Sequence, residues 1–120
     1  MFREVTMLVT RLQEVEKTVP VMEGAKDIYK QVPLSIKDGV PTFSFRVFTI
    51  KPGGHTPFHQ HPFEHMNYVI KGSGVLVAVD GGLELNKGDF ALVLPDEKHQ
   101  FRNTGKGDLV IICAVLKEYE

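Results

Sequence analysis

The amino-acid sequence predicts an all-β domain, a small sandwich or barrel, from about residue 25 to the end of the chain. Short runs rich in β-branched and aromatic residues alternate with turns that contain glycine, proline, asparagine or aspartate. The regular return of these turns is typical of many short strands. At 120 residues the chain is long enough for one hydrophobic core and too short for two ordinary domains.

The candidate strands follow one another with turns between them. We expect strands at residues 28–36, 42–50, 58–61, 65–71, 75–79, 83–86, 90–94, 99–103 and 109–117. The intervening turns are 37–39, 52–54, 71–74, 80–82 and 86–89, where glycine supplies the positive φ that a tight turn requires. Asp80-Gly81 lies between two apolar runs and predicts a hairpin.

The first 24 residues are ambiguous. Residues 8–16 could form an edge strand or a short helix, and Pro20 ends either one. We therefore divide the chain into an N-terminal extension, 1–24, and a single barrel domain, 25–120. Residues 1–10 lack a basic start, an apolar run and a small-residue cleavage site, so no signal peptide is evident.

Composition excludes several classes of function. The net charge is −1 and the lysines are scattered, so we expect neither a nucleic acid nor a membrane as a partner. The longest apolar runs are far shorter than a membrane span. A single cysteine, Cys113, rules out an internal disulfide framework. This composition fits a reducing compartment, and we expect a cytoplasmic protein.

Four of the five histidines form a pattern that suits one metal ion. His59, His61 and His65 lie within seven residues, and His99 opens a later candidate strand. In a strand, His59 and His61 would point to the same face, and imidazole is a common ligand of divalent transition metals. A histidine without a ligand role, phosphate binding by protonated histidines and a proton relay are the competing interpretations.

The sequence resembles the cupin superfamily in two motifs. Gly53, His59, His61 and Gly72 match the first cupin signature, and Gly88, Pro95, His99 and Asn103 resemble the second. The resemblance covers about residues 40–117. It implies a double-stranded β-helix, or jelly roll, with metal ligands at His59, His61, His65 and His99. It says little about the reaction, because this fold carries many chemistries.

The chain departs from the signatures at a ligand position. His65 stands where the family has glutamate, and Glu64 is one residue out of register, which in a strand points it to the other face. Leu94 and Asp96 replace a proline and a glycine of the second signature, which alters the turn but should leave His99 in place. The run Pro62-Phe63-Glu64-His65 is similar to small cupins with four-histidine, often manganese, sites.

The change from glutamate to histidine makes the expected site more positive. The local charge would be about +2 with four neutral histidines, against about +1 with three histidines and a glutamate. Such a site attracts anionic or enolate oxygens, and on an octahedral ion it leaves two positions open. The resemblance implies Mn²⁺, whereas intrinsic affinity at imidazole ligands favours Cu²⁺, Ni²⁺ or Zn²⁺ over Mn²⁺ and Fe²⁺.

Five further residues are candidates for the pocket around the metal. Counting by two from the ligands names Asn67 and Phe101, either as pocket groups or as ordinary interior residues. Arg46, in an apolar strand, either extends into water or clamps a substrate carboxylate. His55 is expected in a loop near the pocket mouth, and Cys113 is a buried thiol that either packs in the core or faces the metal.

These observations favour a metal-dependent enzyme acting on a small molecule rich in oxygen. We expect dioxygenase-like oxidation of a chelating diketone, enediol or phenol, because the sequence offers no obvious general base. A metal-dependent isomerase, decarboxylase or hydrolase, a non-catalytic module for a metal and an anionic ligand, and a purely structural metal are the alternatives. Both faces of strand 42–50 are largely apolar, and we expect a homodimer, in which residues 1–24 are candidates for exchange between the two copies.

Overall fold

The computed structural model describes residues 7–120 and is built from antiparallel strands with three single turns of 3-10 helix. The strands are β1 (Lys26–Leu34), β2 (Phe43–His55), β3 (His65–Lys71), β4 (Ser73–Ala78), β5 (Gly81–Asn86), β6 (Phe90–Val93), β7 (Gln100–Asn103) and β8 (Leu109–Leu116). The 3-10 turns are η1 (Leu12–Glu14), η2 (Ile36–Asp38) and η3 (Lys117–Tyr119). Within residues 7–120, none of the helices has the length and apolar character that a membrane crossing requires.

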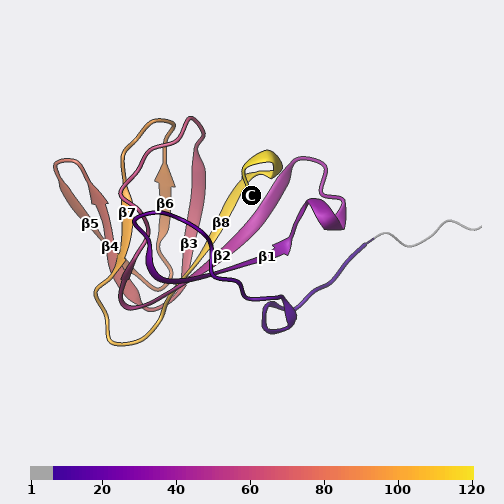
Figure 1. Cartoon of the computed structure of the whole chain (residues 1–120), viewed down its shortest axis with the longest axis horizontal. Helices are drawn as coiled ribbons and strands as arrows, with labels where there is room; N and C mark the ends of the chain where they lie inside the picture. Colours follow the sequence, from indigo (N-terminus) through magenta and orange to yellow (C-terminus); the bar gives the residue numbers. More distant parts are fainter. Residues whose placement is uncertain (1–6) are drawn as a thin grey trace, which may run out of the picture.

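The sheet curls around a central cavity in a jelly roll, which confirms the predicted fold class. Its strands follow the order β5-β4-β7-β2-β8-β3-β6, and β1 pairs with the other edge of β2. Strand β2 joins the two halves: Phe43–Ile50 pairs with β8, whereas His55 at its far end pairs with Arg102 of β7. Figure 1 shows β4, β5 and β7 toward one end of the molecule, β6 and β3 in the middle, and β1 and β2 toward the other end.

The hydrophobic core lies between these two halves. Alternate residues of β8 face inward, and Leu109, Ile111, Cys113 and Val115 are each at most 2% exposed. The core cluster consists of Ile28, Ile50, Val69, Leu76, Leu85, Val93, Phe101, Leu109 and Ile111. Apolar side chains from both halves are therefore buried together, and they stabilise the curled sheet that surrounds the site.

Two sequence expectations about strands were wrong. Residues 58–61 form no strand, and His59 alone makes an isolated bridge, to His99. Pro57 and Pro62 flank this segment, and proline has no N–H to donate to a strand ladder. The turn expected at 52–54 is instead the end of the long strand β2.

A bulge carries β2 through the Pro-Gly-Gly sequence. The register with β1 passes from Ile28 opposite Ile50 to Lys26 opposite His55, so β2 has extra residues between them. Gly53 has a φ of 79°, and a Cβ atom on Gly54 would lie 2.6 Å from the Lys26 carbonyl oxygen. The two glycines therefore bend β2 rather than end it, and they redirect the chain toward the histidine segment.

The segment before β1 packs along the barrel. The Gln31 side chain donates hydrogen bonds to the carbonyl oxygens of Leu12 and Val15, at 2.8 and 3.0 Å, and Thr18 forms a bridge with Lys30. Of the two structures expected for residues 8–16, the chain adopts a three-residue 3-10 turn. Residues 1–6 of the predicted extension lie outside the described residues, and the exchange of residues 1–24 between two copies stays a prediction.

Candidate metal centre

His59 and His99 are brought together by a pair of backbone hydrogen bonds. The N–H of His59 donates to the His99 carbonyl oxygen at 3.1 Å, and the N–H of His99 donates to the His59 carbonyl oxygen at 2.9 Å. Residues that face each other in this way carry their side chains on the same face. Their imidazole ring centroids are accordingly 5.3 Å apart, although the two residues are far apart in the sequence.

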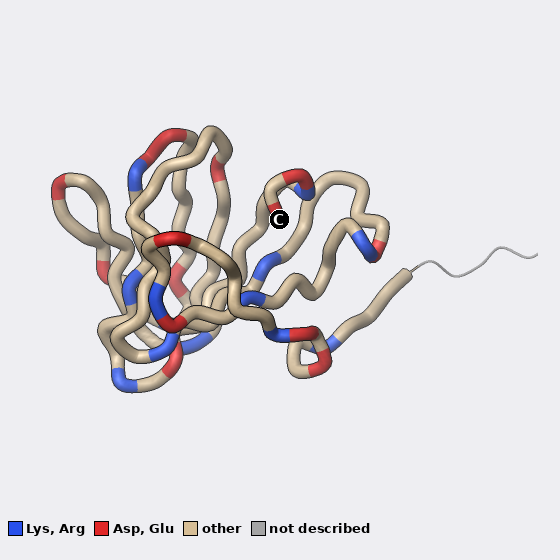
Figure 2. The backbone as a smooth tube through the Cα atoms, in the orientation of Figure 1, with Lys and Arg blue, Asp and Glu red and all other residues tan. Residues whose placement is uncertain are grey.

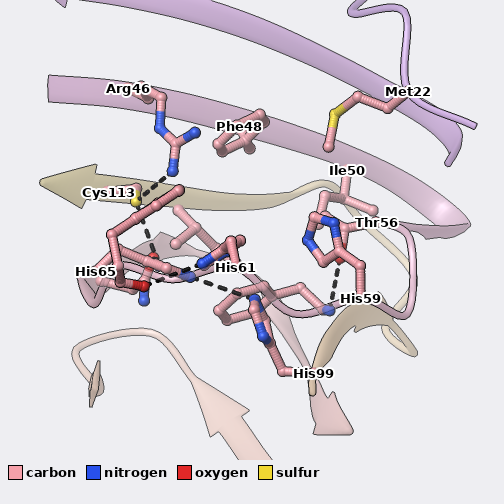
Figure 3. Close-up of a pocket in the computed structure, with 14 residues that line it drawn as sticks. Met22, Arg46, Phe48, Ile50, Thr56, His59, His61, His65, His99 and Cys113 are labelled. Atoms are coloured by element: carbon pink, nitrogen blue, oxygen red, sulfur yellow. Dashed lines mark hydrogen bonds between the residues drawn. The ribbon is translucent and has the colours of Figure 1, made fainter. Parts of the chain in front are cut away.

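His61 and His65 complete a cluster of four histidines. His59, His61 and His99 can each offer one ring nitrogen such that all three nitrogens lie within 4.8 Å of one another. The Nε2 atom of His65, at the start of β3, lies 3.3 Å from Nε2 of His99. Figure 3 shows the four rings at one end of the cavity, below Arg46 and Cys113. The structure thus brings together all four predicted ligand residues, with His65 approaching the three-histidine group through His99.

Hydrogen bonds at Nδ1 determine the tautomer of two histidines. Nδ1 of His99 lies 2.8 Å from the Glu97 carbonyl oxygen, and Nδ1 of His61 lies 3.0 Å from the Phe63 carbonyl oxygen. A carbonyl oxygen only accepts, so each Nδ1 carries the proton. In the neutral form of each ring the lone pair is therefore on Nε2, the nitrogen that ligates a metal when Nδ1 is held by a hydrogen bond.

Asn67 orients His65 in the same manner. The Asn67 side-chain nitrogen donates to the Ala91 carbonyl oxygen at 3.3 Å, which turns its side-chain oxygen toward Nδ1 of His65, 3.1 Å away. Nδ1 of His65 therefore donates, and its Nε2 also carries a lone pair. Asn67 is the carboxamide counterpart of the carbonyl groups that hold His61 and His99.

This arrangement fits a bound cation. The Nε2 lone pairs of His65 and His99 face each other at 3.3 Å, where they repel unless a positive charge lies between them. Two adjacent nitrogens bound to one ion at about 2.1 Å would be about 3.0 to 3.4 Å apart. The donor set, all imidazole, is the set preferred by divalent transition metals rather than by calcium or magnesium.

Burial keeps these imidazoles neutral. It lowers the pKa of His65 from 6.5 to about 3, with the hydrogen bond that His65 donates to Asn67 opposing it and the neighbouring His99 and His61 adding to it. Burial is also the main cause that lowers the pKa of His59 and of His99. A metal binds the neutral form, so at neutral pH these three histidines are ready to bind without losing a proton.

The cavity in front of the histidines has a volume of about 170 Å³ and is largely apolar. Its apolar wall comes from both halves of the barrel and consists of Met22, Phe48, Ile50, Phe63, Phe101 and Ile111. The polar lining comprises the four histidines together with Arg46, Thr56, Asn67 and Cys113. A wall of this kind seats a carbon skeleton and excludes water, while the few polar groups orient it.

The structure brings four of the five predicted pocket residues into this lining: Arg46, Asn67, Phe101 and Cys113. The fifth, His55, is not among the lining residues. It ends β2, and its Nδ1 lies 3.0 Å from the Thr56 carbonyl oxygen and 3.3 Å from the Gln100 side-chain nitrogen. Arg46 points inward, and burial raises the pKa of the Cys113 thiol, so that thiol is neutral rather than an activated nucleophile.

Several site residues were not predicted. Met22 belongs to the segment assigned to the extension, yet it lines the cavity. Phe63 stacks on His61 at 4.0 Å between centroids, and Tyr119 of η3 stacks on the other side of Phe63, also at 4.0 Å. The Pro-Phe-Glu-His run could have drawn attention to Phe63, but nothing in the sequence connects it to Tyr119, because only the folded chain brings η3 there.

Comparisons with known proteins agree with this architecture. Residues 46–115, more than half of the chain, match the cupin domain family. An uncharacterised protein of Methanocaldococcus jannaschii is 27% identical over 94 residues, which cover 78% of this chain and 68% of that protein.

Two solved structures illustrate the likeness of fold. The polyketide cyclase RemF from Streptomyces resistomycificus superposes with a TM-score of 0.87 and 26% identity, covering 92% of this chain and 79% of that one. A predicted oxalate decarboxylase from Thermotoga maritima superposes with a TM-score of 0.80 and 24% identity, covering 92% of this chain and 99% of that one. With its curled antiparallel sheet, its histidine cluster and the cupin domain match, the chain belongs to the cupin family.

Proposed function

We propose that His59, His61, His65 and His99 hold one divalent transition metal ion and that the protein is an enzyme acting on a small molecule that chelates this ion. The observation that carries the proposal is the cluster of four imidazoles at one end of an apolar cavity. Mn²⁺ is our first candidate for the ion, with Fe²⁺, Zn²⁺, Ni²⁺ and Cu²⁺ as alternatives.

The reaction that we propose is dioxygenase-like oxidation of a diketone, enediol or phenol. A divalent manganese or iron ion polarises the oxygens that chelate it and supports their reaction with dioxygen. A carbon–carbon bond beside the chelating oxygens would break, and both atoms of dioxygen would enter the products, so no external reductant is required.

The chain's own residues favour a reaction of this kind. The lining contains neither a carboxylate nor a lysine, and the Cys113 thiol is neutral and hydrogen-bonded to Arg46. A reaction that depended on a protein general base would lack a group for it in this lining. Asn67, Glu97 and Phe63 orient the histidines, and the apolar wall seats the substrate and excludes water.

Oxygen uptake tests this proposal. Protein purified without an affinity tag is loaded with Mn²⁺ or Fe²⁺ and mixed with a panel of acetylacetone, catechol and acyclic enediols in an oxygen electrode. We expect stoichiometric uptake with at least one chelating compound, and none with the metal-free protein. Binding of these compounds without uptake or product would contradict oxidative catalysis and favour the non-catalytic module.

A redox-neutral reaction is the second candidate, because the chain is similar to a polyketide cyclase at 26% identity and a TM-score of 0.87. A polycarbonyl chain could fold against the apolar wall while its oxygens chelate the ion, and a carbon–carbon bond would form with loss of water. Product analysis by mass spectrometry separates the two candidates, since cyclisation changes the substrate without consuming dioxygen.

A further inference from the structure

Arg46 is directed into the cavity by the register of three strands. It lies opposite Cys113 in the pairing of β2 with β8, and Cys113 lies opposite Asn67 in the pairing of β8 with β3. Directly opposed residues share a face of the sheet, and all three line the cavity. Asn67 in turn contacts His65. Arg46 is therefore the far end of a row of side chains that leads to the metal ligands (Figure 3).

The hydrogen-bonding capacity of Arg46 is poorly used within the chain. Nη2 donates to the Cys113 sulfur at 3.1 Å and Nη1 to the Tyr119 carbonyl oxygen at 3.4 Å, while Nε is buried without a partner. A thiol is a weak acceptor, and a carbonyl oxygen carries no net charge. In the part of the chain that the structure describes, the one ion pair joins Lys51 and Asp108, so it does not involve Arg46.

The surroundings of Arg46 include a second cation, an aromatic ring and a carboxylate that already has hydrogen-bond partners. Lys30 lies opposite Phe48 in the pairing of β1 with β2. The guanidinium carbon of Arg46 lies over the Phe48 ring, 5.2 Å from the ring centroid. Burial lowers the pKa of Lys30, and the charge of Arg46 adds to that effect, whereas Glu120 and Cys113 oppose it. The nearby Glu120 carboxylate accepts hydrogen bonds from the Ser44 hydroxyl and the Ile36 N–H. This end of the cavity is therefore suited to receive a negative charge.

We propose that Arg46 is the specificity-determining residue of the site and binds a carboxylate of the substrate at the end of the cavity away from the metal. The inference rests on the proposed function, since the other end of the same molecule would chelate the ion through two oxygens. A guanidinium donates two parallel hydrogen bonds to a carboxylate, a geometry that a thiol cannot offer. The carboxylate would also supply the charged partner that the guanidinium lacks within the described residues.

The size and walls of the cavity indicate the body of this substrate. A volume of about 170 Å³ is close to the apolar cavity of about 150 Å³ that holds one benzene ring in another protein. Of the aromatic side chains that line the cavity, Phe48 lies against Arg46, and Phe101 lies beside His65 and His99. The substrate class is thus a single-ring or similarly compact carboxylic acid with a chelating diol or dicarbonyl group.

Calorimetry with a matched set of probes tests the role of Arg46. The protein is loaded with Zn²⁺, which is redox-inert, and titrated with 3,4-dihydroxybenzoate, its methyl ester and catechol. All three chelate through the same diol, and only the first carries a carboxylate. We expect the carboxylate to bind at least about tenfold more tightly than the ester, as a charge-assisted hydrogen-bonded pair requires.

The Arg46→Gln variant should bind the acid and the ester within about twofold of each other, with catechol binding unchanged, and Arg46→Lys should retain part of the preference. Arg102→Gln is the matched control, because this variant removes the same charge from an exposed residue outside the cavity lining. It should leave the preference for the acid intact. Zinc content and thermal melting are measured for each variant, and Arg46→Lys serves if Arg46→Gln does not fold.

The inference is overturned if the wild type shows no preference for the acid, if none of the probes binds, or if the preference survives in Arg46→Gln. Loss of the preference in Arg102→Gln would overturn it too, because a general field rather than Arg46 would then be the cause. If the preference for the acid depends on Arg46 but no compound is turned over, the result would support the role of Arg46 and contradict the proposed enzymatic function.

Discussion

At the scale of single residues, the site depends on how each imidazole is oriented. His61, His65 and His99 each have Nδ1 held by a neutral oxygen, from Phe63, Asn67 and Glu97. A neutral oxygen acceptor fixes the tautomer without placing a negative charge next to the ligand, unlike a carboxylate. A metal ion bound by these histidines would therefore keep its full charge, which would strengthen its attraction for anionic oxygens.

The lowered pKa of His65 predicts that the metal-free protein loses stability in acid. Its folded-state pKa of about 3 lies below 6.5, so between these values the unfolded chain binds a proton that the folded chain does not. Above pH 6.5 the neutral His65 does not reduce the free energy of unfolding. As the pH falls from 6.5 toward 3, the free energy of unfolding decreases by up to about 1.4 kcal/mol per pH unit. Urea unfolding in EDTA at pH 7 and pH 5 measures this loss.

A His65→Gln variant should lose less stability than the wild type between these two pH values. His55→Gln, which changes a histidine outside the cavity lining, is the control and should behave as the wild type does. Equal losses in the wild type and His65→Gln would show that His65 is not the group that titrates.

Removal of His99 should abolish high-affinity metal binding. Its Nε2 atom faces that of His65, and its backbone pairs with that of His59, so it lies at the centre of the cluster. We expect His99→Ala to weaken Mn²⁺ or Zn²⁺ binding by more than about 100-fold, since loss of an outer-shell partner alone costs about 10- to 100-fold. Competition with a chelating dye measures the affinity, and His55→Ala should bind as the wild type does.

At the scale of elements, glycine positions decide how closely strands approach. Gly72 joins β3 to β4 with a φ of 85°, and a Cβ atom there would overlap the Asp108 carbonyl oxygen. Gly88 has a φ of 95°, but a Cβ atom there would meet no other atom. Both glycines occupy positions of the cupin signatures. Only at Gly72 do close packing and backbone conformation both require glycine.

This difference predicts unequal effects of alanine. Gly88→Ala should cost about 1–2 kcal/mol of unfolding free energy through backbone strain alone. Gly72→Ala should cost at least about 2 kcal/mol more, because the loop before β8 must also move. Urea unfolding of the two variants side by side gives the difference, and similar midpoints would mean that the contact with Asp108 relaxes freely.

At the scale of the whole molecule, the outer face of the sheet is unusually apolar. Phe45 lies opposite Ala114, Ala114 opposite Met66, and Met66 opposite Leu92, so one apolar row crosses four strands. Phe45, Met66 and Leu92 are all exposed, and Phe90 in the adjoining row is 83% exposed. Charged positions of both signs are intermingled elsewhere along the chain (Figure 2). An apolar area of this kind typically marks a protein–protein interface.

We therefore retain the expectation of a homodimer that buries this face. Phe90→Glu should shift the protein to a monomer, because it would place a charge in the apolar contact. Val21→Glu, which changes a fully exposed valine of the segment before β1, is the control and should leave the dimer intact. Light scattering at micromolar concentration gives the mass, and a monomeric wild type would contradict the expectation.

Much of the fold and of the candidate site could be predicted from the sequence alone. Eight of the nine expected strands have counterparts, because alternation and turn residues are local properties. The errors at 52–54 and 58–61 share a cause. Prolines and glycines weaken local strand formation, but whether the chain then turns, bulges or runs extended depends on its pairing partner. Pro-Gly-Gly continues as β2 because β1 accommodates a bulge there.

The sequence by itself determined the small β-barrel and identified four histidines as predicted metal ligands, because motif spacing and alternation are local properties of the chain. Only the tertiary structure decided what surrounds them. The cavity lining includes Arg46, Met22 and Phe63, and Tyr119 stacks on Phe63. These residues come from four separate segments, and their meeting depends on strand register and on closure of the barrel. Inward or outward orientation of Arg46 was open in the sequence, since both faces of its strand are apolar, and the pairing with Cys113 settles it.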